Sequence, residues 1–280
     1  MASFDFIEAT SRGYEFSWYE RSYLMRAAIP VILVKIACIL VVRFMGAEEQ
    51  YLLNGLLFIP AHILEALLMI SVIRYIAFSE PLFEFGRVMG SVDDSDLELD
   101  KKPEVKEMIG ISPFARVQMF KAGVAMFLLI KIIQLGLLGI MADFSKTLEP
   151  VVSTQAPEHN AVSVIILIAV TGAMLWAFRL VWLYIPVALG HSVSGFMARI
   201  KGMMSSLSIF ATWFVCYFPV GMLLYGVFSI SNFILVPESA LHVLTHDIIK
   251  AFGETLIVLV QVAAMTFGFI EVLTAKKKKK

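Results

Sequence analysis

The sequence predicts an all-α integral membrane protein, a bundle of six membrane-spanning helices, and three observations carry that prediction. Hydrophobic residues make up 59% of the 280 residues, above the roughly 45–50% that is usual for soluble domains. The mean hydropathy is +0.81. The apolar residues also gather into six runs, each long enough for a helix to cross a hydrocarbon core, which takes about 20 residues. Backbone groups in lipid must be satisfied within their own segment, so runs of this length favour helices over strands.

In chain order, the first expected element is an amphipathic segment, residues 1–23, in which aromatic and charged residues alternate. Such a helix lies in the membrane interface. The transmembrane domain, residues 24–275, follows, and its first apolar run is too far from the start and too acidic in its flank for a cleaved signal peptide. The expected spans are 24–45, 52–78, 117–141, 161–186, 204–230 and 250–273, followed by a polybasic tail, 276–280.

The distribution of Lys and Arg predicts the orientation of the bundle, because cytoplasmic loops carry an excess of these residues. One side holds Arg12, Arg21, Arg26, Arg74, Arg87, Lys101, Lys102, Lys106, Arg116, Lys121, Arg199, Lys201 and Lys276 to Lys280. The other side holds Arg43, Lys146 and Lys250. Both termini and the large loop 79–116 are therefore predicted to be cytoplasmic. Each lysine of the tail adds roughly 1 kcal/mol of attraction to anionic lipids.

Repeated helical hairpins are a further hypothesis. Arg74 and Arg179 each precede a proline, Pro81 and Pro186, at the same spacing. The alternative is chance similarity between helices built from a small apolar alphabet. If the hairpins are repeats, a site at their junction is expected.

Polar residues gather near the expected bilayer midplane, around the carboxylate of Glu65. Ionisable groups at this depth are costly, so they face the bundle interior and find partners. One interpretation is an ion pair that fixes helix register. The other is a polar site for an anionic headgroup, a small anion or a proton relay. The residues of this expected cluster are Lys35, His62, Glu65, Lys131, Gln134 and Gln261.

A second candidate site lies in the fourth span. Arg179 stands about 9 Å inward of the span midpoint, deeper than an ordinary flanking charge, yet within reach of the interface. Trp176 and Trp182 give it an aromatic setting. These three residues are candidates for binding a lipid headgroup near the inner leaflet. The alternative is ordinary anchoring in the aromatic belt.

A third pattern has the spacing of a metal site. His242 and His246 are one helical turn apart, and Glu238 comes one turn earlier. Val243 stands where a zinc protease would carry its general base, and a third ligand would come from Glu238 or from His159. The alternative is a solvated amphipathic helix. No cofactor is expected.

Several classes of function are excluded by what the sequence lacks. It contains no Gly-rich phosphate loop, nucleophile elbow or Cys-x-x-Cys, and its longest loop is too short for a catalytic domain. Cys38 and Cys216 lie in apolar runs as packing residues. Expected partners are membrane lipids, with anionic headgroups at the basic inner face, and a protein partner or a second copy of the chain. Nucleic acid is not expected.

One stretch resembles a known family. From Ala161 to Ile230 the chain carries a deep Arg179, then Leu-Tyr-Ile-Pro-Val-Ala-Leu-Gly, then a short basic amphipathic turn from Ser192 to Lys201. This arrangement is similar to the six-helix membrane domains associated with bacterial glycerophosphodiesterases and to their uncharacterised stand-alone relatives. The resemblance implies a bacterial inner-membrane protein with a lipid-related or scaffolding role. It implies no catalytic residues, because the phosphodiesterase domain is absent.

Three hypotheses of function follow. The first is binding or transport of an anionic lipid or small solute through the midplane site. The second is a non-catalytic structural or assembly subunit of a membrane complex. The third is an intramembrane enzyme that uses His62 and Glu65. The expected location is the bacterial inner membrane, or the endoplasmic reticulum in a eukaryote, where Lys277 and Lys278 would resemble a dilysine retrieval signal.

Overall fold

The computed structural model describes residues 4–47, 50–82, 113–152, 171–236 and 239–274, and these residues form helices and no strand. Six helical segments in this part are long and apolar enough to cross a membrane, which confirms the predicted all-helical membrane class. The candidate spans are Arg21–Phe44, Ile59–Phe78, Phe114–Leu137, Thr171–Ala188, Met203–Ile234 and Ala240–Thr274. The predicted orientation and the hairpin repeats stay predictions. The loop residues 83–112 and the tail 276–280 lie outside the described residues.

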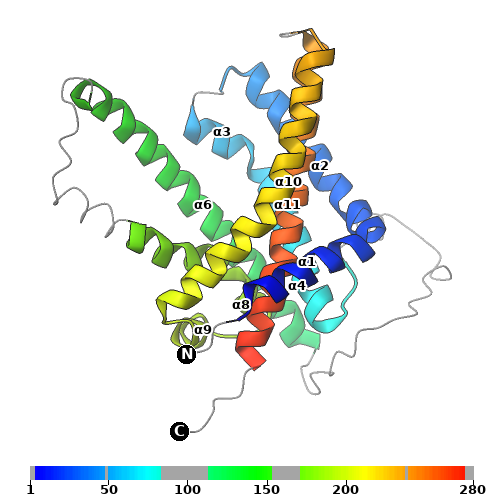
Figure 1. The fold of residues 1–280 in the computed structure, drawn as a ribbon, viewed down its shortest axis with the longest axis vertical. Helices are drawn as coiled ribbons and strands as arrows, with labels where there is room; N and C mark the ends of the chain where they lie inside the picture. Colours follow the sequence, from blue (N-terminus) through cyan, green and yellow to red (C-terminus); the bar gives the residue numbers. More distant parts are fainter. Residues whose placement is uncertain (1–3, 48–49, 83–112, 153–170, 237–238, 275–280) are drawn as a thin grey trace.

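The last helix, α11 (Ala240–Thr274), is the centre of the bundle. It packs against α1 (Phe6–Tyr19), α2 (Arg21–Phe44), α4 (Ile59–Phe78) and α10 (Met203–Ile234), as Figure 1 shows. More of its apolar window is buried than in any other candidate span of the described part. These helices enclose a hydrophobic core, which includes Met69, Ile73, Ile185, Met265 and Phe269.

Glycines allow two helices to approach α11 closely. A Cβ added at Gly13 of α1 would lie 2.6 Å from Ala264 Cβ, and one added at Gly253 of α11 would collide with a Leu224 methyl of α10. Small residues at such crossings let helix backbones pack tightly, which is a principal source of association energy in membranes.

Helix α1 crosses α10 and α11, and buries Ala9, Thr10 and Gly13 in doing so. The Tyr14 hydroxyl donates to the carbonyl of Cys216 at 2.9 Å. Burial, and then the neighbouring Cys216 thiol, raise the pKa of Tyr14 to about 12, so the hydroxyl stays protonated as a donor. The placement of residues 1–23 in the membrane interface stays a prediction.

The second expected span is not one helix but two. Helix α3 (Tyr51–Leu57) ends before Phe58, and α4 begins at Ile59 with Pro60 in its first turn. Pro60 has no N–H, and its ring clashes with the carbonyl one turn earlier, so the chain breaks there. By contrast, Pro30 and Pro219 lie inside the continuous helices α2 and α10.

The fourth span is also interrupted. Helical residues 171–178 lead into a 3-10 turn, η2 (Arg179–Trp182), and then into α8 (Tyr184–Ala188). Pro186 cannot donate to the carbonyl of Trp182, which is where the tighter turn ends. Gly190, with φ of 81°, follows the end of α8, and Ser192 caps α9 (Val193–Arg199). Residues 161–170 of the expected span lie outside the described residues.

The remaining helix, α6 (Pro113–Val152), is 40 residues long, so it extends well beyond the expected span 117–141. It packs against α3, α4 and α8 and leans away from the centre in Figure 1. Its apolar window is the least buried of the candidate spans in the described part of the chain.

Candidate functional site

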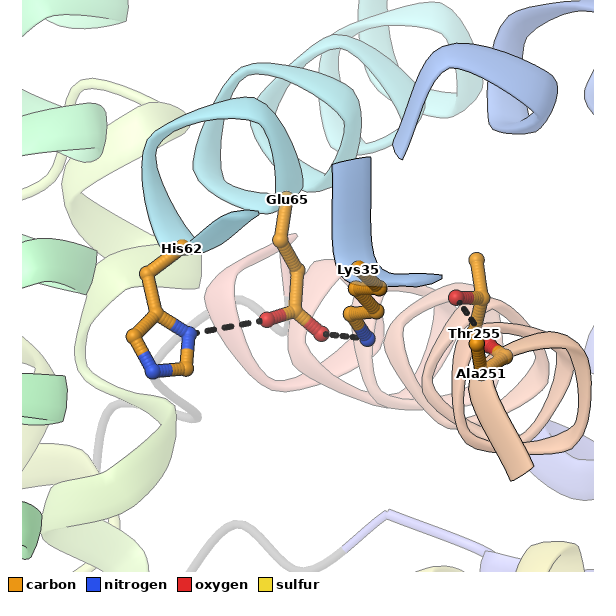
Figure 2. Close-up of polar contacts among 5 residues, drawn as sticks. All are labelled: Lys35, His62, Glu65, Ala251 and Thr255. Atoms are coloured by element: carbon orange, nitrogen blue, oxygen red, sulfur yellow. Dashed lines mark hydrogen bonds and ion pairs between the residues drawn. The ribbon is translucent and has the colours of Figure 1, made fainter. Parts of the chain in front are cut away.

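The centre of the candidate site is a buried ion pair between α2 and α4. Lys35 Nζ donates to Glu65 Oε1 at 3.1 Å, and Figure 2 shows the two side chains meeting between their helices. Lys35 is only 4% exposed and Glu65 only 2%. Removal of either charge from water costs several kcal/mol, and a close, hydrogen-bonded partner is what offsets that cost.

His62 completes the contacts of the carboxylate from one turn earlier on α4. Its Nδ1 lies 3.4 Å from Glu65 Oε2, and in the tautomer with a proton on Nδ1 it donates that proton (Figure 2). The break before α4 sets its position, because the His62 N–H closes the first turn onto the Phe58 carbonyl. The His62 side chain is 18% exposed, so it is the more open end of this group.

Lys131 brings a second ammonium group close to the pair from α6. Its charge acts on Glu65 together with that of Lys35, and its Nζ stands 5.5 Å from the centre of the Phe127 ring. Half-buried Lys131 is therefore less enclosed than Lys35. We define the Glu65 cluster as Lys35, His62, Glu65 and Lys131.

The two glutamines expected in the cluster behave differently. Gln261 is buried, but its Nε2 reaches the Trp213 carbonyl of α10 at 3.5 Å, so it points to another helix. Gln134 is half-buried on α6 and makes no hydrogen bond to the Glu65 cluster within the described part of the chain. The prediction grouped residues by their depth in the membrane, and it therefore included two glutamines that do not bind the Glu65 carboxylate.

Tyr184, which is close to Arg179 in the sequence, is a neighbour of Glu65 in the structure. It is buried on α8 near the Glu65 carboxylate, and its ring meets that of Phe127 edge-on with the ring centres 5.0 Å apart. The only signal in the sequence was a tyrosine hydroxyl within an apolar span, which needs a polar neighbour.

Arg179 forms a separate site at the 3-10 turn. Its Nε donates to the Trp176 carbonyl at 2.9 Å, and its Nη1 donates to the Ile200 carbonyl at 2.6 Å. The guanidinium carbon lies 5.0 Å from the centre of the Trp176 ring. Trp182, by contrast, is buried beside Phe178 and Tyr184. The three expected headgroup residues thus lie within two consecutive helical turns.

Three arginines share a structural role that the sequence did not reveal: each donates to the carbonyl end of another helix. Arg74 reaches Ala188 at the end of α8, Arg179 reaches Ile200 at the end of α9, and Arg199 reaches Val272 and Leu273 near the end of α11. Cations are favourable at helix C-termini, where carbonyls lack partners. Arg74 also holds Glu80 in a two-pronged ion pair.

The metal pattern is only partly described. His242 and His246 lie with ring centres 4.3 Å apart, and His242 Nε2 contacts Asn232 Oδ1 at 2.8 Å. Glu238 and His159 lie outside the described residues. Among the residues that are described, no group of three or more His, Cys, Asp or Glu is placed to hold a metal ion. The neighbouring Asp247 binds Arg43 of α2 instead.

These features define a class: an all-helical chain with six candidate membrane spans and a charged cluster enclosed among them. No family model, curated protein or solved structure matches the chain. The likeness to membrane domains associated with glycerophosphodiesterases therefore stays a prediction.

Proposed function

We propose that this multi-pass membrane protein binds, and transports, an anionic lipid or small anionic solute at the Glu65 cluster. The observation that carries the proposal is that one buried carboxylate contacts two basic side chains, those of Lys35 and His62, with the Lys131 ammonium group near enough to interact with its charge. With His62 neutral, the cluster holds one more positive than negative charge. A net positive group among apolar helices attracts anions, because the low local dielectric strengthens the interaction.

The cluster has a closed part and an open part, and we assign them different roles. Lys35 and Glu65 are enclosed and bind each other, so they hold the site in shape. His62 and Lys131 are partly exposed, on α4 and α6. An anion would meet these two more open basic groups before the enclosed pair. The break at Pro60 supports this role because it places His62 in the first turn of α4.

The second candidate is a structural or assembly subunit. The observation in its favour is that Lys35 and Glu65 are buried so completely that they could serve only to fix the register of α2 against α4. The exposed apolar faces of α6 and α10 would then meet lipid or another subunit. An intramembrane enzyme has less support, because both Glu65 oxygens already contact basic groups.

Reconstitution into vesicles of phosphatidylcholine and phosphatidylglycerol tests the proposal. The probes are fluorescent phosphatidylglycerol, whose movement between leaflets is measured, and radiolabelled chloride and phosphate, whose efflux is measured. We expect flux of at least one probe above that of protein-free vesicles. Lys131→Met should reduce it about tenfold or more, since removal of a charged hydrogen-bond donor costs roughly 1.5–3 kcal/mol.

The matched control is Lys121→Met, which removes the same charge from an exposed position on the same helix. It should leave flux unchanged. Equal flux in the wild type, Lys131→Met and protein-free vesicles would contradict transport. If a stoichiometric protein partner then co-purifies in mild detergent, the assembly hypothesis takes its place.

A further inference from the structure

Arg179 stands apart from every other buried charged residue in the described part of the chain. Lys35 pairs with Glu65, Arg74 with Glu80, and Asp247 with Arg43. Arg179 is 2% exposed, yet no described carboxylate faces it, and its Nη2 has no hydrogen-bond partner there. A buried cation without an anion is strongly unfavourable, so an anion from outside the chain is the partner that would complete this site.

A second buried donor without a described partner lies on the same turn. Trp182 is 4% exposed, and its Nε1 is unpaired. Arg179 and Trp182 are the first and last residues of η2, and in a 3-10 helix side chains three residues apart stand on the same side. One guanidinium N–H group and one indole N–H are thus presented from one side of a single turn.

Two hydrogen bonds hold the Arg179 guanidinium in place, so it cannot turn toward another partner within the described part of the chain. Nε and Nη1 are fixed by the carbonyls of Trp176 and Ile200, which leaves only Nη2 unsatisfied. The face of the guanidinium is covered by the Trp176 ring. Trp176 is 49% exposed, so a rotamer change there would open the site without repacking the core.

The Arg179 site lies near the ends of two helices, α9 and α11. Ile200 ends α9, and the adjacent Arg199 reaches the last turn of α11, so Arg179 is level with the ends of these helices. In Figure 1, η2 leads to α8 and α9, which lie at the same end of the bundle as the end of α11. The predicted span 250–273 ends beside these residues, which is where headgroups are expected.

We propose that Arg179 and Trp182 bind a phosphate group, with Arg179 Nη2 and Trp182 Nε1 as donors to its oxygens and Trp176 as the cover. The phosphate would be that of a phospholipid headgroup or of free phosphate. Arginine suits this ligand, because its planar array of donors matches a phosphate and its charge is permanent. The site shares no residue with the Glu65 cluster and does not depend on its function.

Binding to the detergent-purified full chain tests the proposal. The probes are short-chain phosphatidylglycerol, short-chain phosphatidylcholine, inorganic phosphate and, without any phosphate, short-chain diacylglycerol. Affinity is measured from the change in tryptophan fluorescence and, separately, from the ligand-induced rise in unfolding temperature. Arg179→Gln should weaken phosphate-dependent binding about 10- to 100-fold, and Trp182→Phe about two- to tenfold.

Two variants serve as matched controls. Arg12→Gln removes one positive charge from an exposed ion pair on α1. Trp213→Phe makes the same substitution as Trp182→Phe, at a half-buried position on α10. Both should bind as the wild type does. Lys131→Met should also bind normally, which separates this site from the Glu65 cluster. Should Arg179→Gln fail to fold, Trp182→Phe still tests the site, since it keeps most of the ring.

The four probes also identify the source of the phosphate. Binding of both phospholipids but not of inorganic phosphate, lost with Arg179, supports a headgroup site. Binding of inorganic phosphate, lost in the same variant, supports a free-anion site with the same chemistry. Wild-type binding of diacylglycerol as tight as that of phosphatidylglycerol, no binding of any phosphate compound, or binding unchanged in both Arg179→Gln and Trp182→Phe would overturn the proposal.

Discussion

At the scale of single residues, the Lys35 and Glu65 pair gives the sharpest prediction about stability. Lys35→Met leaves the Glu65 carboxylate buried without its closest partner, and Glu65→Gln leaves the Lys35 ammonium without a carboxylate. Each single change should lower the free energy of unfolding by about 3–5 kcal/mol. The double variant Lys35→Met and Glu65→Gln should cost less than either one, because no buried charge is left alone.

Reversible unfolding in mixed micelles measures these differences, with Lys121→Met as the exposed control. A double variant as unstable as the sum of the two single variants would show that the two side chains act independently. That result would contradict the buried pair.

The sequence predicted how deep these residues lie in the membrane better than it predicted which way their side chains point. Lys35, His62 and Glu65 were expected together and do meet, because residue counting along a span fixes the height of each side chain. Gln261 has the same expected height but turns to Trp213. The direction of a side chain depends on which face of each helix packs inward, and helices that are apolar all round carry little pattern to reveal that face.

At the scale of elements, close helix crossings decide how α1 is held on the bundle. A Cβ added at Gly13 would meet Ala264 at 2.6 Å, whereas nothing lies within 4 Å of a Cβ added at Gly136 on α6. Gly13→Ala should therefore destabilise the protein by about 1–3 kcal/mol through overpacking. Gly136→Ala should be neutral or stabilising by up to about 1 kcal/mol, because alanine is the better helix former.

Thermal unfolding of the two variants tests this contrast, since each replaces a helical glycine with alanine. A Gly13→Ala protein as stable as Gly136→Ala would mean that α1 does not press on α11 at this point. A loss of stability in Gly136→Ala instead would mean that the outer face of α6 is covered.

The number of membrane spans was easier to predict than the positions at which a span is interrupted. All six candidate spans were expected, because apolar runs of about 20 residues are a strong signal. The interruptions at Phe58 and at Arg179–Trp182 were not placed, although Pro60 and Pro186 mark both. Prolines are ambiguous within spans, since Pro30 and Pro219 lie in unbroken helices. Neighbouring helices decide which proline breaks its helix.

At the scale of the whole molecule, the distribution of basic residues predicts the direction of the bundle in the membrane. Labelling from one side tests this in a chain in which the buried Cys38 and Cys216 are replaced by alanine. New single cysteines are placed at Ser11 on α1 and at Ala240 at the start of α11, both exposed positions. In right-side-out vesicles, a membrane-impermeant maleimide should label Ala240→Cys directly and Ser11→Cys only after the membrane is opened, because the positive-inside rule places α1 on the cytoplasmic side of the membrane. Labelling of Ser11→Cys alone in closed vesicles would reverse the bundle, and it would place the Arg179 site at the outer leaflet. Equal labelling of both positions in closed vesicles would contradict an odd number of crossings between α1 and the start of α11.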